Sequence, residues 1–270
     1  MAVPDRGDGS IVATTVTGDG YTLWYEAVGE GPGVVFPSRM RVEHSALASA
    51  LAAEGYRVVR YKPRQVVGVM EAEDEAGGPW DPVGWSSYPL EAEIADLHAV
   101  ADAAGVGDFV LAGYSGMAAL AGFLVTATDR AAGLMIGGFP LLSDYGYWLG
   151  YVEGARTAFL QAGRADKANE QHLGVLLYRE WAARDDVTAL RALKGPKILW
   201  YGSRDSEPEC RMYQYTGGSA IARRIVEHTG RLHDAGFEVI EFEDLDHIAG
   251  LATADVIAPR LSAALAAAGW

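Results

Sequence analysis

The chain has very little cysteine, no long apolar run and no basic cluster, and each shortage excludes a class of protein. Cys210 is the single cysteine among 270 residues, so a disulfide framework cannot form and a reducing cytoplasm is expected. With no base indicated beside it, Cys210 is expected to be a bystander rather than a reactive thiol. No stretch approaches the roughly 20 apolar residues of a membrane helix. The segment 1–9 lacks the apolar region of an export signal.

Acidic residues outnumber basic ones, 36 to 22, and are spread along the chain, which gives a net charge of −14. A nucleic-acid-binding protein usually carries a basic stripe, and this sequence has none, so neither nucleic acid nor membrane is expected as a partner. The histidines lack ligand-like spacing with cysteines or carboxylates, so no metal is expected. No Gly-x-Gly-x-x-Gly pattern or phosphate loop indicates a nucleotide cofactor. The sequence leaves the oligomeric state open, a homodimer included.

Short apolar segments alternate with helical segments along most of the chain. The first two apolar segments, 11–16 and 21–28, flank the turn sequence Thr17-Gly-Asp-Gly20 and are typical of a β-hairpin. Further strands are predicted within 34–36, 56–61, 109–112, 132–138, 197–201 and 238–242. Helices are predicted within 45–54, 91–104, 117–125, 219–234 and 256–267. This pattern indicates an α/β protein whose mostly parallel sheet has helices on both faces and an antiparallel edge made by the hairpin.

The alternation breaks between residues 141 and 187, where the sequence is helical and rich in aromatic residues. We expect residues 1–140 and 188–270 to form the core domain and residues 141–187 to form a helical cap inserted after one strand. Such a cap lies over the carboxyl ends of the strands, where open α/β sheets bind ligands. The alternative is that its aromatic residues pack only against one another: Tyr145, Tyr147, Trp148, Tyr151, Phe159, Tyr178 and Trp181.

The segment Gly113-Tyr-Ser-Gly-Met117 lies directly between a predicted strand and a predicted helix. A sharp turn at this point strains the backbone of Ser115 and lifts its hydroxyl above the sheet edge, as a nucleophile requires. Small residues are needed where strand and helix approach closely, and Gly113 and Gly116 meet this need. Met117 stands where the usual pattern has a second glycine. The alternative is an ordinary turn serine.

A nucleophilic serine needs a base and an acid that orients the base. Asp205 follows the predicted strand 197–201, and His247 follows the predicted strand 238–242. Both therefore leave the sheet at the same edge as Ser115, in the chain order serine, acid, histidine. Asp205 has an ordinary alternative as a turn residue, and His247 has one as a structural histidine. The competing acids are Asp144, Asp246 and Glu207.

These motifs resemble those of the α/β-hydrolase superfamily, and the resemblance runs over nearly the whole chain. Segment 19–32 is similar to the family's opening hairpin and turn, and segment 51–59 to the helix and strand after its oxyanion loop. Gly202-Ser-Arg-Asp205 and Asp246-His247 are similar to its acid and histidine segments. The resemblance implies an α/β-hydrolase fold with a small helical cap and assigns a catalytic triad to Ser115, Asp205 and His247.

The sequence departs from the family in the loop that normally supplies one amide to the oxyanion hole. The family usually has His-Gly after this strand, whereas this chain has Pro37-Ser-Arg-Met40. The other amide comes from the residue after the nucleophile, here Gly116. Since Pro37 has no N–H, we assign the first amide to Ser38 or Arg39.

The resemblance implies a serine hydrolase without a cofactor that cleaves a small or medium-sized ester, lactone or thioester through an acyl-enzyme. A serine nucleophile argues against the family's dehalogenases and epoxide hydrolases, which use aspartate. The same triad serves two alternatives, a carbon–carbon bond cleavage and a non-hydrolytic lyase or cyclisation reaction. A third alternative is a member that binds a small molecule without catalysis. A mostly apolar substrate pocket is expected to include Tyr114, Trp148, Tyr145, Phe139 and Trp85.

Overall fold

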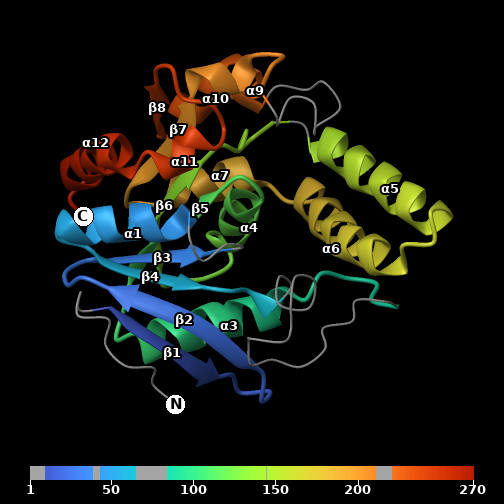
Figure 1. The fold of residues 1–270 in the computed structure, drawn as a ribbon, viewed down its shortest axis with the longest axis horizontal. Coiled ribbons are helices and arrows are strands. Elements are labelled where there is room, and N and C mark those ends of the chain that lie inside the picture. Colours follow the sequence, from blue (N-terminus) through green and yellow to red (C-terminus); the bar gives the residue numbers. More distant parts are fainter. Residues whose placement is uncertain (1–9, 39–42, 65–83, 144, 211–220) are drawn as a thin grey trace.

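The sheet runs through the middle of the molecule (Figure 1). The structure is a computed structural model that describes residues 10–38, 43–64, 84–143, 145–210 and 221–270. The described strands form one 8-stranded sheet in the order β1-β2-β4-β3-β5-β6-β7-β8. Their bounds are β1 Ile11–Val16, β2 Thr22–Val28, β3 Gly33–Pro37, β4 Arg57–Tyr61, β5 Phe109–Tyr114, β6 Ala131–Gly137, β7 Lys197–Gly202 and β8 Glu238–Phe242.

The six strands from β4 to β8 in the sheet order are parallel, and the β1–β2 hairpin adds the antiparallel edge. The α/β class, the parallel sheet and its hairpin edge are therefore confirmed. The helices are α1 Glu43–Ala53, α3 Leu90–Ala103, α4 Gly116–Leu124, α5 Tyr145–Gln161, α6 Ala165–Ala182, α7 Asp186–Ala192, α9 Ile221–Glu227, α10 Thr229–Asp234, α11 Ala249–Ala252 and α12 Ala254–Ala267. A short 3-10 helix covers Ser203–Ser206.

Alternate residues of the central strands build two separate cores, one on each face of the sheet. Val34 and Val110 belong to the core that α1 and α12 cover. Val35 and Leu111 belong to the other core, which α3 and α4 cover. This division follows from the two-residue period of a strand, which sends successive side chains to opposite faces. Figure 1 shows α1 and α12 side by side on their face of the sheet.

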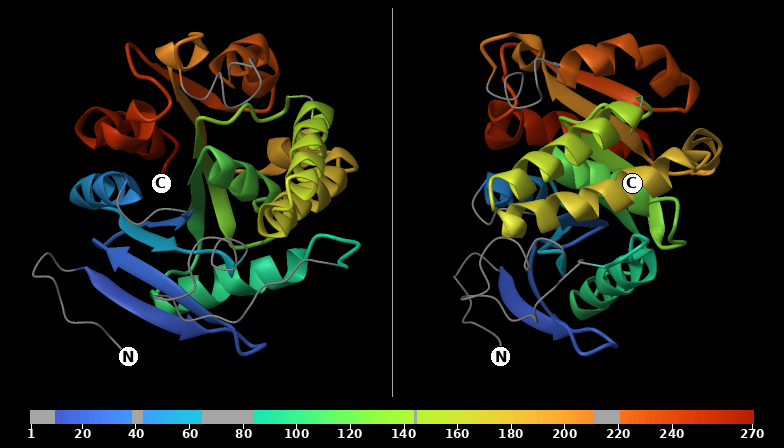
Figure 2. Two further views of the ribbon diagram at one scale, coloured as in Figure 1. Left: turned by 45° about the vertical axis from the view of Figure 1, so that its right-hand side comes forward. Right: turned by 90° about the vertical axis from the view of Figure 1, so that its right-hand side faces the viewer.

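The segment between β6 and β7 contributes α5, α6 and α7. Helices α5 and α6 pack against each other as a hairpin. In Figure 1 this pair stands on the side toward which the β3 and β4 arrows point, and the right-hand view of Figure 2 shows it in front of the sheet. The helical content predicted for this segment is present. Its status as a separate cap domain stays a prediction.

One predicted helix is divided. The sequence predicts a continuous helix over 219–234, but the structure has α9 and α10 with His228 between them. The His228 backbone leaves helical geometry, with φ −108° and ψ 8°, and its ring contacts the Arg224 carbonyl at 2.8 Å. Gly230 lies in the first turn of α10. Because glycine destabilises the interior of a helix, it favours a break between α9 and α10.

A buried ion-pair cluster ties the hairpin to α3. Arg64, which follows β4, donates from Nε to Asp96 Oδ2 at 2.6 Å and from Nη1 to Asp19 Oδ2 at 2.7 Å. The guanidinium lies 4.5 Å from the centre of the Tyr21 ring. Asp96 is fully buried, and burial raises its pKa, while the hydrogen bonds from Arg64 and Thr17 lower the pKa of the more exposed Asp19.

We expect Arg64→Met to lower the free energy of unfolding by about 3 kcal/mol, because Asp96 then stays buried without its countercharge. Urea unfolding followed by circular dichroism measures the change. Arg164→Met is the matched control, since Arg164 and its partner Asp166 are both exposed and their pair contributes little. Equal losses in the two variants would contradict the role given to the buried cluster.

Candidate active site

Ser115 lies on a sharp turn between β5 and α4. Its φ is 54° and its ψ is −126°, a backbone conformation that serine rarely adopts. The turn brings the two elements so close that a Cβ on Gly113 would lie 2.5 Å from the Met117 carbonyl oxygen. A Cβ on Gly116 would meet nothing within 4 Å. The need for a small residue is therefore met at Gly113, and packing does not require glycine at 116.

Ser115, His247 and Asp205 lie in one hydrogen-bonded chain. The Nε2 of His247 lies 2.9 Å from the Ser115 hydroxyl, and Nδ1 lies 2.8 Å from Asp205 Oδ2. Ser115 follows β5, Asp205 follows β7 and His247 follows β8. Because these strands are parallel, their carboxyl ends meet at one edge of the sheet and bring the three residues together. Asp205 is fully buried and His247 nearly so, which shields both from water.

The described competitors of Asp205 are occupied elsewhere. Asp246 Oδ1 accepts hydrogen bonds from the backbone amides of Ile248 and Ala249, at 3.0 and 2.8 Å. Glu207 accepts from Arg204 at 3.0 Å on the surface. Asp144 lies outside the described residues. Among the described carboxylates that the sequence suggested, Asp205 alone contacts His247.

Cys210 contacts the Asp205 carboxylate, which the sequence did not predict. Its sulfur donates to Asp205 Oδ1 at 3.3 Å, and both side chains are buried. The expectation of a bystander rested on the absence of a base nearby, and the neighbour is instead an acid. Cys210 follows Asp205 by five residues in a loop without periodicity, so the sequence carries no signal for this contact.

Tyr114 packs against His247, and its role in substrate binding stays a prediction. Its hydroxyl donates to the His247 carbonyl at 2.7 Å, and the two ring centres lie 5.2 Å apart. Two glycines make room for this arrangement. A Cβ on Gly250 would lie 2.5 Å from the Tyr114 hydroxyl, and one on Gly138 would lie 2.9 Å from His247 Cε1. Tyr114 therefore supports the loop that carries His247.

Phe139, Trp148 and Tyr145 belong to one aromatic stack, which also includes Trp181. Phe139 packs against Trp148 at 5.8 Å between ring centres and against Trp181 at 5.9 Å. Tyr145 lies on the other side of Trp181, at 4.4 Å. Phe139 directly follows Gly138, the residue whose Cβ would lie 2.9 Å from His247 Cε1. Trp85 is only partly buried, and its carbonyl lies 3.1 Å from His172 Nε2.

The amides expected to form the oxyanion hole differ in whether they already donate a hydrogen bond. Gly116 is the first residue of α4, where backbone amides have no acceptor within the helix, so its N–H suits an anion. The Ser38 amide instead donates to the Tyr61 carbonyl at 2.8 Å and extends the pairing of β3 with β4. The assignment of Ser38 as backbone donor is therefore wrong, because its N–H is already bonded. Arg39 lies outside the described residues.

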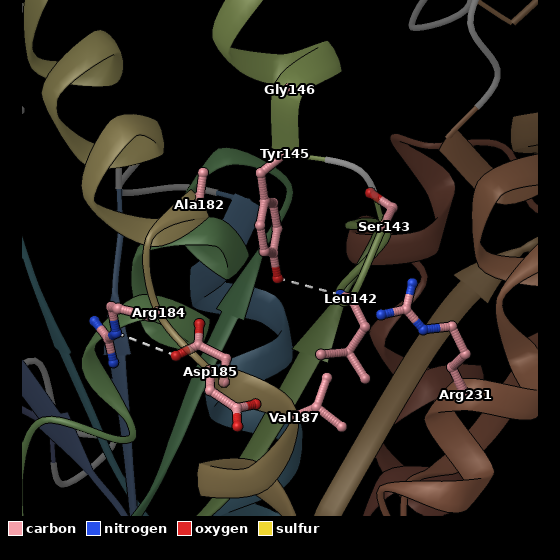
Figure 3. A pocket seen from close by; sticks show the side chains of 10 residues that line it. Leu142, Ser143, Tyr145, Gly146, Ala182, Arg184, Asp185, Val187 and Arg231 are labelled. Carbon is pink, nitrogen blue, oxygen red and sulfur yellow. Dashed lines mark hydrogen bonds and ion pairs between the residues drawn. The ribbon is translucent and has the colours of Figure 1, made fainter.

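A cavity of about 320 Å³ opens where the chain enters α5 and leaves α6. Figure 3 shows Arg184 and Arg231 on opposite sides of it, with Tyr145 between them. Asp186 also lines the cavity and is nearly fully buried. Its Oδ1 lies 3.1 Å from Arg184 Nε, and its Oδ2 has no partner among the described residues. Burial raises the pKa of Asp186 to about 6, and the ion pair with Arg184 offsets this only in part.

The described residues offer no metal site and no membrane span. No group of three or more histidines, cysteines and acidic residues could hold an ion in the part of the chain that the structure describes. Within the same residues, every helix is too short or too polar to cross a bilayer.

Solved structures with the same fold cover almost the whole chain. An α/β hydrolase from Sphaerobacter thermophilus matches with a TM-score of 0.56 and 22% identity, over 93% of this chain and 99% of that one. An epoxide hydrolase from Vigna radiata matches with a TM-score of 0.64 and 16% identity, over 96% of this chain and 98% of that one. An enol-lactonase from Burkholderia xenovorans matches with a TM-score of 0.60 and 17% identity, over 94% of this chain and all (100%) of that one.

These likenesses establish that the chain has the α/β-hydrolase fold. No protein-family model matches the sequence, and no curated protein matches it either. The fold hosts different chemistries, as an epoxide hydrolase and a lactonase among the similar structures illustrate.

We expect Asp186→Asn to become more stable relative to the natural chain as the pH rises from 5 to 8, by about 1 kcal/mol. The pKa of Asp186 is about 6 in the folded chain and near 3.8 when exposed. The stability gained from its protonated form is complete below the lower value and is lost as the pH rises through the higher one. Asparagine stays neutral throughout and escapes this loss.

Urea unfolding at pH 5 and pH 8 measures the difference. Asp185→Asn is the control, because the exposed Asp185 caps α7 and its pKa is lowered by Thr188, outside this pH range. A difference between Asp186→Asn and the natural chain that stays constant with pH would mean that the carboxylate is not desolvated.

Proposed function

We propose that the protein is a serine hydrolase that cleaves an ester, lactone or thioester through an acyl-enzyme. The observation that carries this proposal is the hydrogen-bonded chain from Ser115 through His247 to Asp205, with distances of 2.9 and 2.8 Å. A second support is the positive φ of Ser115, since strain of this kind is retained where it serves a function. A serine at the nucleophile position disfavours the aspartate-based chemistry of an epoxide hydrolase.

In the proposed reaction, Ser115 Oγ attacks the substrate carbonyl while His247 Nε2 accepts the hydroxyl proton. Asp205 holds the ring through Nδ1 and stabilises the imidazolium that forms. The Gly116 amide and a donor from the loop after β3 bind the oxyanion. His247 then protonates the leaving group, and a water molecule activated by the same nitrogen releases the acid and restores Ser115.

The substrate is proposed to be small or medium-sized with an apolar portion. The support is the buried aromatic stack of Phe139, Trp148 and Trp181, since Phe139 is the residue after Gly138, which lies against His247. We propose that residues 141–187 act as a cap that presents these rings to the substrate. The similarity to an enol-lactonase is consistent with a cyclic or linear ester.

A second candidate is a non-hydrolytic reaction of the same triad, such as carbon–carbon bond cleavage or cyclisation. The observation that favours it is the loop after β3. Its proline and the bonded Ser38 amide remove two residues from the set of oxyanion donors. Loss of one such donor typically costs about 10²–10³ in rate for acyl transfer.

We expect a fluorophosphonate probe to label the natural chain and not Ser115→Ala, because an activated serine displaces fluoride from the probe and becomes phosphonylated. His247→Ala should label at least about 100-fold more slowly, since no base then accepts the hydroxyl proton. Intact-mass spectrometry measures the labelling. An unlabelled natural chain would refute the proposal. Labelling without turnover of a panel of p-nitrophenyl esters would favour the second candidate.

Asp205→Asn is expected to lower kcat/KM for a p-nitrophenyl ester by about 10³–10⁴, because an amide cannot stabilise the imidazolium. Asp246→Asn is the matched control in the neighbouring loop. An asparagine Oδ1 can accept the same two backbone hydrogen bonds, from Ile248 and Ala249, so this variant should keep its activity within about threefold. If Asp246→Asn lost as much activity as Asp205→Asn, the acid would be assigned wrongly.

A further inference from the structure

We propose that Cys210 is a positioning residue that tunes the Asp205–His247 pair through its S–H···O hydrogen bond. The inference rests on the proposed function, because Asp205 matters to catalysis only within the triad. It assigns the Cys210 thiol to Oδ1 of Asp205, whereas Oδ2 is the oxygen that bonds to His247.

The two oxygens of Asp205 have different partners. Oδ2 lies 2.8 Å from His247 Nδ1, and Oδ1 accepts from Cys210 Sγ at 3.3 Å. Asp205 is fully buried, so water does not hydrate Oδ1. The described residues include no arginine or lysine paired with this carboxylate. The thiol is thus the described donor that stabilises the second oxygen.

The backbone after Asp205 holds the thiol in place. The Glu207 amide donates to the Arg204 carbonyl at 3.1 Å, and the Cys210 amide donates to the Glu207 carbonyl at 3.0 Å. These two successive turns carry the chain back over Asp205, and Cys210 is buried there at 7% exposure. A side chain fixed by its own backbone contributes a hydrogen bond at little entropic cost.

A thiol is a weak hydrogen-bond donor, so its effect on the Asp205–His247 pair is moderate. A substitution at position 210 can strengthen or remove this effect. The S–H dipole directs its positive end at Asp205 and stabilises the carboxylate charge. The same positive end disfavours a positive charge on the neighbouring His247 ring. A stronger donor at position 210 should therefore make His247 harder to protonate, and removal of the donor should make it easier.

The thiol acts in its protonated form. Burial and the adjacent carboxylate both disfavour a thiolate, so Cys210 donates a hydrogen bond and does not compete with Ser115 as a nucleophile. No covalent step involves the sulfur.

Three substitutions at position 210 separate donation from packing. Cys210→Ser keeps a donor and strengthens it, Cys210→Ala removes the donor and leaves space, and Cys210→Val removes the donor but fills the space. We expect the pKa of His247 to fall by about half a unit in the serine variant and to rise by about half a unit in both donorless variants. If packing alone mattered, the serine and valine variants, which both fill the space, would have similar His247 pKa values. If hydrogen-bond donation matters, the alanine and valine variants, which both lack a donor, have similar values.

Nuclear magnetic resonance of the imidazole ring nitrogens, with His247 assigned by comparison with His247→Gln, measures this pKa without any turnover. The order Ser, then Cys, then Ala and Val from lowest to highest supports the proposal. An unchanged value in all three variants, or a common direction of change, overturns it. A variant that fails to fold is recognised by circular dichroism, and the remaining pair still tests the order.

Kinetic measurements then test whether the order of His247 pKa values among the variants also appears in the reaction. The acid limb of kcat/KM for a p-nitrophenyl ester should move with the pKa of His247 in the same order. In an Asp205→Asn background the Cys210 variants should no longer differ. If the natural chain neither hydrolyses esters nor reacts with fluorophosphonate, the proposed function fails, while the ring titration still decides whether Cys210 tunes His247.

Discussion

The close approach of β5 and α4 at Gly113 is the constraint on which the site depends. With the Met117 carbonyl 2.5 Å from where a Cβ would lie, the chain must turn sharply at the next residues, and Ser115 takes a φ of 54°. The strain directs the hydroxyl away from both elements and leaves the first amide of α4 beside it. A single backbone turn therefore places the Ser115 hydroxyl beside a backbone N–H donor that has no acceptor within the helix.

The parallel sheet supplies the remaining geometry. Since β5, β7 and β8 run in the same direction, the loops that follow them meet at one edge, and residues up to 132 positions apart come within hydrogen-bonding distance. The loop with His247 is then supported by Tyr114, the residue before Ser115. The β5 strand thus carries Ser115 and also helps to position His247.

The parts of the site that the sequence could predict are those tied to strand ends. Ser115, Asp205 and His247 each follow a short apolar strand in a fixed chain order, so their convergence could be anticipated. Cys210 could not, because loop residues have no period that relates spacing to direction. The Ser38 amide was misassigned since its hydrogen bond to Tyr61 depends on strand pairing one residue beyond β3. Likewise, the break between α9 and α10 depends on the backbone conformation of His228, which the spacing of apolar residues does not reveal.

Three buried aspartates show how the surroundings of a carboxylate decide what it can do. Asp96 is bound by the permanent cation Arg64, and Asp186 has one contact with Arg184 and a raised pKa. Asp205 has neither: within the described residues its partners are an imidazole and a thiol. A permanent cation would neutralise the charge that an imidazolium needs. Because no permanent cation is among these partners, the charge of Asp205 stays available to an imidazolium, as the proposed reaction requires.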